Sequence, residues 1–92
     1  MKIKGRITML GAVDTITRRY DNLKRRQIVV AFRESEDGTN YIEHSLSLTL
    51  ENEWADKELE IEAEYMFDLA FYVDMFNGRM FNRIRVTKID TL

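Results

Sequence analysis

The sequence predicts an all-β domain built from five antiparallel strands, and three observations support this fold class. An Asn-Gly pair stands between two alternating apolar runs, which is the strongest short-range signal of a β-hairpin. Most of the remaining chain alternates apolar with polar residues, as half-buried strands do, and proline is absent. A chain of 92 residues has room for one modest core, so we expect a single domain over residues 1–92.

The Asn77-Gly78 pair fixes the register of the predicted hairpin. A two-residue type I′ turn places Phe76 opposite Arg79, and the strands pair outward from there. One face then carries the pairs Phe76/Arg79, Asp74/Phe81, Tyr72/Arg83, Ala70/Arg85 and Asp68/Thr87. The opposite face carries Met75/Met80, Val73/Asn82, Phe71/Ile84 and Leu69/Val86. Because this second face is mainly apolar, we expect it to belong to the core.

Residues 1–13 form the first expected strand. Its alternation predicts that Ile3, Ile7 and Met9 face the core. Gly5 lies within it, where a glycine allows the bend with which a strand turns the corner of a small barrel. Residues 14–23 are polar and have no sustained period, which predicts a loop.

The second and third strands are expected over residues 24–34 and 41–50, with a hairpin turn at residues 36–40. The alternation predicts inward-facing side chains at Ile28, Val30, Phe32, Ile42, Leu46, Leu48 and Leu50. His44 shares this parity, so we expect it to lie in the core or at the rim of the barrel.

Residues 51–57 allow only one or two turns of helix, with Trp54 expected as a lid on the core rather than as a stacking platform. A long fourth strand is expected over residues 58–76, and the fifth runs from residue 79 to about residue 89. The odd-numbered residues of the fourth strand are expected in the core, namely Leu59, Ile61, Ala63, Tyr65, Phe67, Leu69, Phe71 and Val73.

This order of elements, with a glycine in the first strand, predicts an OB-like Greek-key barrel of five strands with one short helix between the third and fourth. The segment between those strands is short for a helix that plugs the barrel. We therefore expect a barrel that is partly open at one end. An open antiparallel meander is the alternative.

The net charge of −2 conceals a strong segregation of charge along the chain. Residues 1–33 carry nine Lys or Arg against two acids, residues 34–74 carry one Lys against thirteen acids, and residues 75–92 carry four basic residues against one acid. A local patch, rather than the sum, decides whether a polyanion can bind. The acidic and basic blocks can equally attract each other within the fold.

Several classes of site are not expected. The chain has no cysteine and one histidine, and it shows no phosphate-binding glycine loop, nucleophile elbow or catalytic pair of carboxylates, so we expect no metal, cofactor or enzymatic activity. Alternate residues of a strand are about 6.5–7 Å apart, so the acidic row Glu58, Glu60, Glu62 and Glu64 is expected to be a solvated face. Without a membrane-length apolar run or a signal-peptide core, a cytoplasmic location is expected, with no membrane partner.

Two segments combine the residue types that bind single-stranded nucleic acid, namely cations for phosphates and aromatic rings for bases. In an OB-fold, ligands lie under the loops that join strands one and two and strands four and five. The first loop supplies Arg18, Arg19, Tyr20, Lys24, Arg25 and Arg26. The second hairpin supplies Tyr72, Phe76, Arg79, Phe81, Arg83 and Arg85. The hypothesis is a non-enzymatic module that binds single-stranded nucleic acid.

Two alternatives remain open for the hairpin face. It can serve as a protein or homodimer interface, because aromatic residues and arginine are enriched at interfaces. It can also be purely structural, with Asp68 and Asp74 paired to Arg85 and Arg83 and Tyr72 lying under Arg83.

The chain also resembles a family of small OB-fold proteins of Bacteroidetes and their mobile elements, described as similar to single-stranded-DNA-binding proteins. The resemblance lies in residues 3–7 (IKGRI), 24–30 (KRRQIVV) and 77–85 (NGRMFNRIR). It implies an OB-fold and binding of single-stranded nucleic acid. In that family a tryptophan commonly ends the third strand, whereas here Leu48-Thr49-Leu50 ends it and Trp54 comes later.

Overall fold

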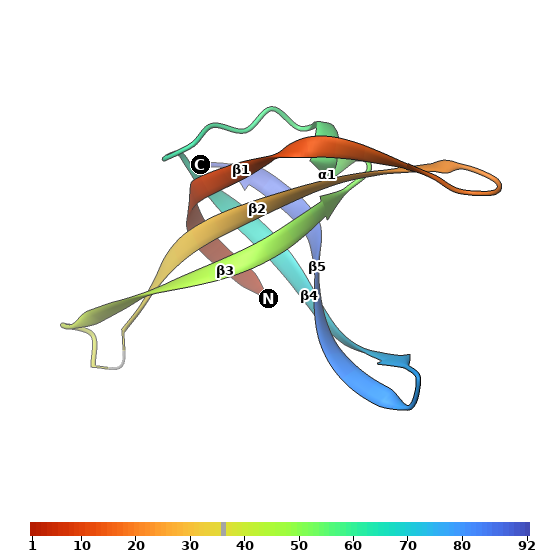
Figure 1. Ribbon diagram of the computed structural model, residues 1–92. Coiled ribbons are helices and arrows are strands. Elements are labelled where there is room, and N and C mark those ends of the chain that lie inside the picture. Colours follow the sequence, from red (N-terminus) through yellow and green to blue (C-terminus); the bar gives the residue numbers. More distant parts are fainter. Residues whose placement is uncertain (36) are drawn as a thin grey trace.

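The computed structural model describes residues 1–35 and 37–92 and is all-β, as the sequence predicted. Its elements are β1 (Lys2–Thr17), β2 (Asn22–Ser35), β3 (Tyr41–Glu51), α1 (Glu53–Asp56), β4 (Glu64–Phe76) and β5 (Arg79–Thr91). All strand pairs are antiparallel, and the sheet order is β3-β2-β1-β4-β5 (Figure 1). Of the turn expected at residues 36–40, Glu36 lies outside the described residues.

The sheet curls into a partly open barrel because β1 changes partners along its length. Residues 2–6 of β1 pair with β4, and from Arg6 onward β1 pairs with β2. Gly5 lies at this change of partner. A Cβ atom there would be 3.3 Å from the Cβ of Val30 and 3.5 Å from the ring of Phe67, so the glycine allows the layers to approach closely. Between β3 and β5 the described residues form no ladder, which leaves the barrel open along this seam.

The core fills the inside of this curved sheet. The side chains with almost no exposed surface are Phe67, Ile7, Ile28, Leu48, Leu50 and Val30. Burying a side chain of this kind contributes roughly 1.5–3 kcal/mol to folding. Trp54 of α1 packs against the same cluster, as its expected position as a lid requires.

The expected burial of Met9 in β1 was wrong, and the error comes from a β-bulge. The register of β1 against β2 shifts between Ile7 and Met9 and again between Leu10 and Val13. Because one extra residue reverses the facing of all that follow, Met9 is exposed and Leu10 packs on the core instead.

Residues 14–23 do not form the expected loop. Both strands continue through this segment as a two-stranded ribbon, and only the four residues from Arg18 to Asp21 turn the chain. The backbone N–H of Arg18 donates to the carbonyl of Asp21 at 2.8 Å. Residue propensities alone do not predict this ribbon, because its strands are joined by backbone hydrogen bonds and no alternating apolar face marks them in the sequence.

The fourth strand begins at Glu64 rather than at residue 58. Residues 58–63 are irregular, and Glu62 has a left-handed backbone with φ of 72°. Ile7 ties this segment to β1, because its N–H donates to Ala63 and its carbonyl accepts from Glu62. Ile61, expected in the core, is exposed, and so is Ile42 of β3. Of the acidic row, only Glu64 lies on a strand, and all four carboxylates are exposed.

The hairpin between β4 and β5 has the predicted register over most of its length. Asn77 and Gly78 both have positive φ (51° and 75°), as a type I′ turn requires, and every predicted pair from Phe76/Arg79 to Leu69/Val86 is present. The last predicted pair is wrong, because a bulge after Asp68 places it opposite Lys88 rather than Thr87.

The largest correction concerns the face of this hairpin that was expected in the core. Leu69 and Val86 are buried, but the hairpin continues past the barrel, so that neither face of its outer part meets the core. Phe71, Val73 and Met75 are 58%, 60% and 67% exposed, and Met80 is 74% exposed. Strand alternation shows which residues share a face, but it does not show whether anything packs on that face.

Candidate nucleic-acid interface

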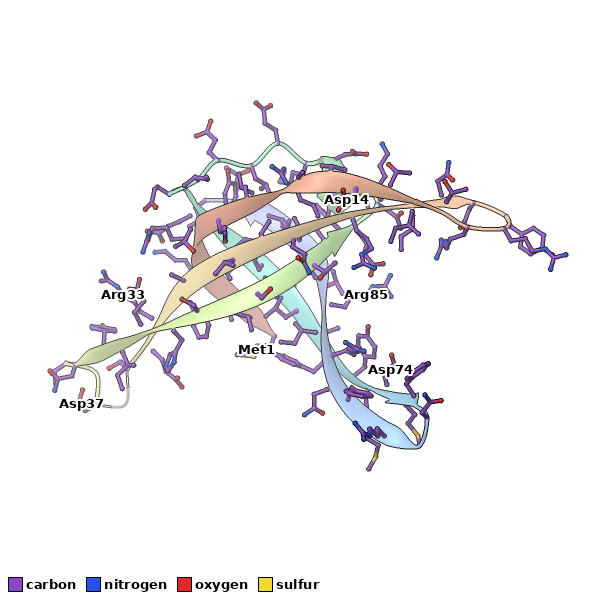
Figure 2. The ribbon with its side chains drawn as sticks, in the orientation of Figure 1. Met1, Asp14, Arg33, Asp37, Asp74 and Arg85 are labelled. Atoms are coloured by element: carbon purple, nitrogen blue, oxygen red, sulfur yellow. The ribbon has the colours of Figure 1, made fainter. Side chains whose placement is uncertain are left out.

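Two hairpins extend beyond the barrel and diverge on the right of Figure 1. We call residues 13–26, from β1 and β2, the basic arm, and residues 70–85, from β4 and β5, the aromatic arm. Together the two arms carry all twelve predicted site residues. The third hairpin, between β2 and β3, points the opposite way and carries Asp37 at its turn (Figure 2).

The cations of the basic arm are largely engaged within the chain. Arg18 donates to both carboxylate oxygens of Asp21, from Nε at 2.7 Å and from Nη2 at 2.6 Å. The Lys24 ammonium binds Asp56 of α1 at 2.9 Å. These ion pairs are half-exposed, and exposed ion pairs contribute only ~0–1 kcal/mol to stability. A phosphate can therefore compete with the carboxylate for either cation.

The remaining residues of the basic arm are open to solvent. The Arg19 guanidinium lies 5.3 Å from the centre of the Tyr20 ring, and that ring is 87% exposed at the tip of the arm. Arg25 is exposed. Its register partners on the two neighbouring strands are both acidic, Asp14 on β1 and Glu51 on β3. Within the described residues, neither Arg19 nor Arg25 forms an ion pair.

A glycine and an arginine fix the base of the basic arm. Arg26 is partly buried, and its Nε donates to the carbonyl of Gly11 at 2.7 Å. Gly11 lies in the second bulge of β1, where a Cβ atom would be 2.8 Å from the carbonyl oxygen of Gln27. Only glycine fits this contact without a backbone shift. A bulge strengthens the local twist, which turns the arm away from the barrel.

One side of the aromatic arm, which we call the aromatic face, alternates rings with arginines. Its side chains are Tyr72, Asp74, Phe76, Arg79, Phe81, Arg83 and Arg85, together with Ala70. Phe76 and Tyr72 are 66% and 50% exposed, and Phe81 is 38% exposed. The Arg83 guanidinium lies 5.4 Å from the centre of the Phe81 ring, and its Nε is 3.7 Å from Asp74. The predicted pairing of Arg83 with Asp74 is therefore present.

The other side of the aromatic arm, which we call the neutral face, has no ionisable side chain. It consists of Phe71, Val73, Met75, Met80, Asn82 and Ile84, and it continues directly from the buried pair Leu69/Val86. Asn82 is its only polar residue. The two faces of one ribbon thus have different chemistry.

The short helix α1 has neighbours in both arms. Lys24 of the basic arm binds Asp56 of α1, and the carbonyl of Lys24 accepts from the N–H of Asn52 at 2.9 Å. Trp54 of α1 and Arg85 of the aromatic arm line one cavity of about 220 Å3 at the open seam between β3 and β5. Figure 2 shows Arg85 between the two arms. The sequence favoured Trp54 as a lid over a stacking platform and did not predict that Arg85 is its neighbour.

The cations at the start of β1 are neutralised at a distance from the arms. Arg6 binds Glu62 and Glu43, and these two carboxylates raise the pKa of the guanidinium. Lys4 lies 3.6 Å from Glu64. Part of the acidic middle of the sequence therefore neutralises the basic first strand, while Asp56 and Asp74 pair with cations of the two arms.

The opposite end of the molecule is anionic. Backbone N–H groups of Asn40 and Thr39 donate to the carboxylate of Asp37 and lower its pKa to about 2. His44 lies at the rim, as expected, with Nε2 3.1 Å from a Glu34 oxygen and its ring 5.5 Å from that of Phe32. The third hairpin thus carries acidic side chains at the end of the molecule away from the two arms (Figure 2).

No protein-family model matches the chain, and no curated protein and no solved structure shows significant similarity to it. The described residues include no helix with the length and apolarity needed to cross a membrane. Nor do three His, Asp or Glu side chains among them come together in a group that could hold a metal ion.

Proposed function

We propose that the chain is a non-enzymatic module that binds single-stranded nucleic acid with its two arms. The observation that carries the proposal is the aromatic face, on which three exposed rings alternate with three arginines along one side of a ribbon. Stacking of a base on such a ring contributes about 1–3 kcal/mol and tolerates any base, because each base has a π-face.

The path of the strand follows from the placement of the rings and cations. Bases stack on Phe76 and Tyr72, the most exposed rings of the face, while Arg79 and Arg83 reach the phosphates between them. The strand then crosses the seam beside Arg85 and Trp54 and continues along the basic arm. There Arg19 and Arg25 meet phosphates directly, whereas Asp21 and Asp56 compete with the phosphates for Arg18 and Lys24.

Single strands are favoured over duplex because the rings need unstacked bases. In a duplex the bases are stacked on one another, so the rings would have no base to stack on and only the cations of the two arms would contribute to binding.

A titration of a labelled single-stranded oligonucleotide at several salt concentrations tests the proposal. If about five phosphates are contacted, log affinity falls with log salt with a slope near −3 to −4, at roughly −0.7 per contact. A duplex of the same sequence is the control and should bind more weakly. Absence of saturable binding at low salt would reject the proposal and leave the aromatic face as a protein-docking surface.

A matched pair of variants on one strand sharpens this experiment. Arg25→Ala removes a cation from the basic arm, whereas Arg33→Ala removes an exposed cation at the other end of β2. Both lower the net charge by one. Only Arg25→Ala should reduce the salt slope, by about 0.7. Equal effects of the two variants would show that overall charge, not the basic arm, attracts the oligonucleotide.

A further inference from the structure

The cavity at the open seam between β3 and β5 has a lining that suits one flat polar ring. We call it the seam cavity; its volume is about 220 Å3, and its lining includes Glu51, Asn52, Glu53, Trp54 and Arg85. Pockets for drug-sized ligands measure about 300–1,000 Å3, so the seam cavity has room for a smaller group. An aromatic ring, one cation and two carboxylates meet in it.

Trp54 supplies the ring on which a ligand can stack. It is half-buried, because it packs against the core and also lines the seam cavity. Packing on the core restrains the indole, so little further side-chain entropy is lost when a second ring stacks on it. Trp54 can therefore be a lid on the core and a stacking platform at the same time.

The charged groups of the seam cavity are not paired with one another. Within the described residues, neither Arg85 nor either glutamate of the cavity forms an ion pair. A second cavity, of about 320 Å3, shows the contrast, because its Lys4 lies 3.6 Å from Glu64. Its Arg6 likewise lies 3.1 Å from Glu43. Only the seam cavity of these two keeps a guanidinium and two carboxylates available to a ligand.

The backbone between the two glutamates is strained. Asn52, which separates them in the sequence, has φ of 54°, a left-handed value that is uncommon for residues other than glycine. Its N–H donates to the carbonyl of Lys24 at 2.9 Å, and its carbonyl accepts from the N–H of Ala55 at 3.1 Å. These bonds hold the strained conformation at the edge of the cavity. Strain of this kind clusters at ligand sites, where it holds side chains ready for binding.

The charges of the seam cavity decide which part of a nucleotide it accepts. Two carboxylates against one guanidinium repel a phosphate. An apolar group is disfavoured as well, because it would remove charged side chains from water without giving them a partner. A base remains, since it is uncharged and flat and carries donors and acceptors along its edges. This step rests on the proposed binding of single-stranded nucleic acid.

A guanidinium together with a carboxylate selects guanine among the four bases. Guanine presents two acceptors, O6 and N7, which match the paired N–H donors of an arginine. Its N1–H and its exocyclic amine are neighbouring donors, which match the two oxygens of one carboxylate. Adenine and cytosine each offer one amino group and thymine one N–H, so none of these three presents two such donors side by side. We propose that a guanine base stacks on Trp54 in the seam cavity, with Arg85 at O6 and N7 and one glutamate of the cavity at N1–H and the amine.

Labelled oligothymidine strands with and without one central guanine test the proposal by fluorescence anisotropy. The strand with guanine should bind roughly 5- to 150-fold more tightly, which is the discrimination that a bidentate base contact provides. One adenine or one cytosine at the same place should gain much less. Hypoxanthine lacks the exocyclic amine of guanine, and 7-deazaguanine lacks its N7 acceptor. Each of these two bases should lose most of the gain.

Arg85→Lys separates the guanidinium from its charge. Lysine keeps the positive charge but not the paired donors, so the ratio of the two affinities, with and without guanine, should fall toward one. Arg79→Lys, on the same face but outside the lining of the cavity, is the matched control and should keep the ratio. Both positions are exposed, so both variants should fold, which circular dichroism checks.

A double variant tests the carboxylates in the same way. Glu51→Gln with Glu53→Gln should also bring the ratio toward one, because an amide cannot accept both guanine donors. The exposed pair Glu58→Gln with Glu60→Gln lies outside the cavity lining and is the control. Both double variants remove two negative charges and strengthen binding of every strand, so the ratio is the quantity to compare.

The outcomes distinguish this inference from the proposed function. Equal binding of all strands would overturn the guanine site and leave the proposed function intact, and a preference that survives Arg85→Lys would do the same. If no strand binds, the proposed function fails and a titration with guanosine decides the inference. Trp54 is the only tryptophan of the chain, so its emission reports the seam cavity. A saturable change with guanosine but not with adenosine would support a site for the free nucleoside, and no change would overturn it.

Discussion

The two arms are both twisted two-stranded hairpins, but they differ in what their side chains already bind. In the basic arm, Arg18, Lys24 and Arg26 each bind an oxygen of the same chain. In the aromatic arm, Phe76 is two-thirds exposed, and Arg79 and Arg85 form no ion pair within the described residues. Three of the five cations of the basic arm are engaged before any ligand arrives, against one of the three arginines of the aromatic arm.

This difference indicates how each arm contributes to binding. A ligand must displace Asp21 to reach Arg18 and Asp56 to reach Lys24, so each of these two phosphate contacts replaces an ion pair of similar strength, and only Arg19 and Arg25 are open. A base that stacks on the aromatic arm displaces only water. We therefore expect the aromatic arm to carry most of the affinity and the basic arm to carry the salt dependence.

The largest expected effect comes from removing rings of the aromatic face. Phe76→Ala should weaken binding of a single-stranded oligonucleotide by roughly 5- to 150-fold, because one stacked base contributes about 1–3 kcal/mol. The double variant with Tyr72→Ala should lose more than either single one. Fluorescence anisotropy at fixed salt measures both.

Tyr41→Ala is the matched control for this prediction. Tyr41 is 63% exposed, close to the 66% of Phe76, but it lies on the third hairpin, which points away from both arms. It should leave the affinity unchanged. If Tyr41→Ala and Phe76→Ala weaken binding equally, exposed rings anywhere on the surface suffice, and the contrast between the arms fails.

The next effect concerns the base of the basic arm. Gly11→Ala places a Cβ 2.8 Å from the carbonyl oxygen of Gln27, so the bulge must shift. We expect the free energy of unfolding to fall by about 1–3 kcal/mol, as overpacking of a tight contact usually costs. Urea denaturation measures it, with Ala12→Gly at the next, exposed position as control. An unchanged stability would mean that the arm does not need this bulge.

Much of the fold was predictable because local signals determined it. Asn77-Gly78 specified a turn type and hence eight residue pairs, and Gly5 marked the corner of β1. The errors arose where an extra residue in a strand reverses which side chains face the core and no residue type marks the bulge, as between Ile7 and Met9. Gly11 was the available signal for the second bulge, since a glycine within a strand often marks one.

The candidate site was less predictable than the fold. The register correctly gathered the six predicted site residues of this hairpin on its aromatic face, because alternation in a strand is a local property. It did not show that the opposite side, from Phe71 to Met80, lies beyond the edge of the core. How far a hairpin extends past a barrel depends on where β1 stops pairing with β4, which is a property of the whole fold.

A smaller effect is expected at the tip of the aromatic arm. Gly78 has φ of 75°, and in the left-handed region an alanine costs roughly 1–2 kcal/mol. A Cβ atom at position 78 meets no atom within 4 Å, so backbone strain is the only cost of Gly78→Ala. Asparagine tolerates the left-handed backbone, so Gly78→Asn should keep most of the stability that Gly78→Ala loses. Urea denaturation of the two variants should show this order.

Because the turn fixes the register of the aromatic face, Gly78→Ala should also lower oligonucleotide affinity more than Gly78→Asn does. Equal values for the two variants would show that the tip does not control the face.

The smallest effect is expected from releasing a cation of the basic arm. Asp21→Ala removes the carboxylate that Arg18 binds, so the guanidinium becomes available to a phosphate. Because an exposed ion pair contributes only ~0–1 kcal/mol, affinity for a single strand should rise by no more than about fivefold. The salt slope should steepen by about 0.7.

Glu34→Ala removes an exposed carboxylate at the far end of β2 and controls for net charge, so its slope should match the wild type. If the slope of Asp21→Ala also matches the wild type, Arg18 is not held back by Asp21, and the weaker contribution of the basic arm must then come from its position rather than from its ion pairs.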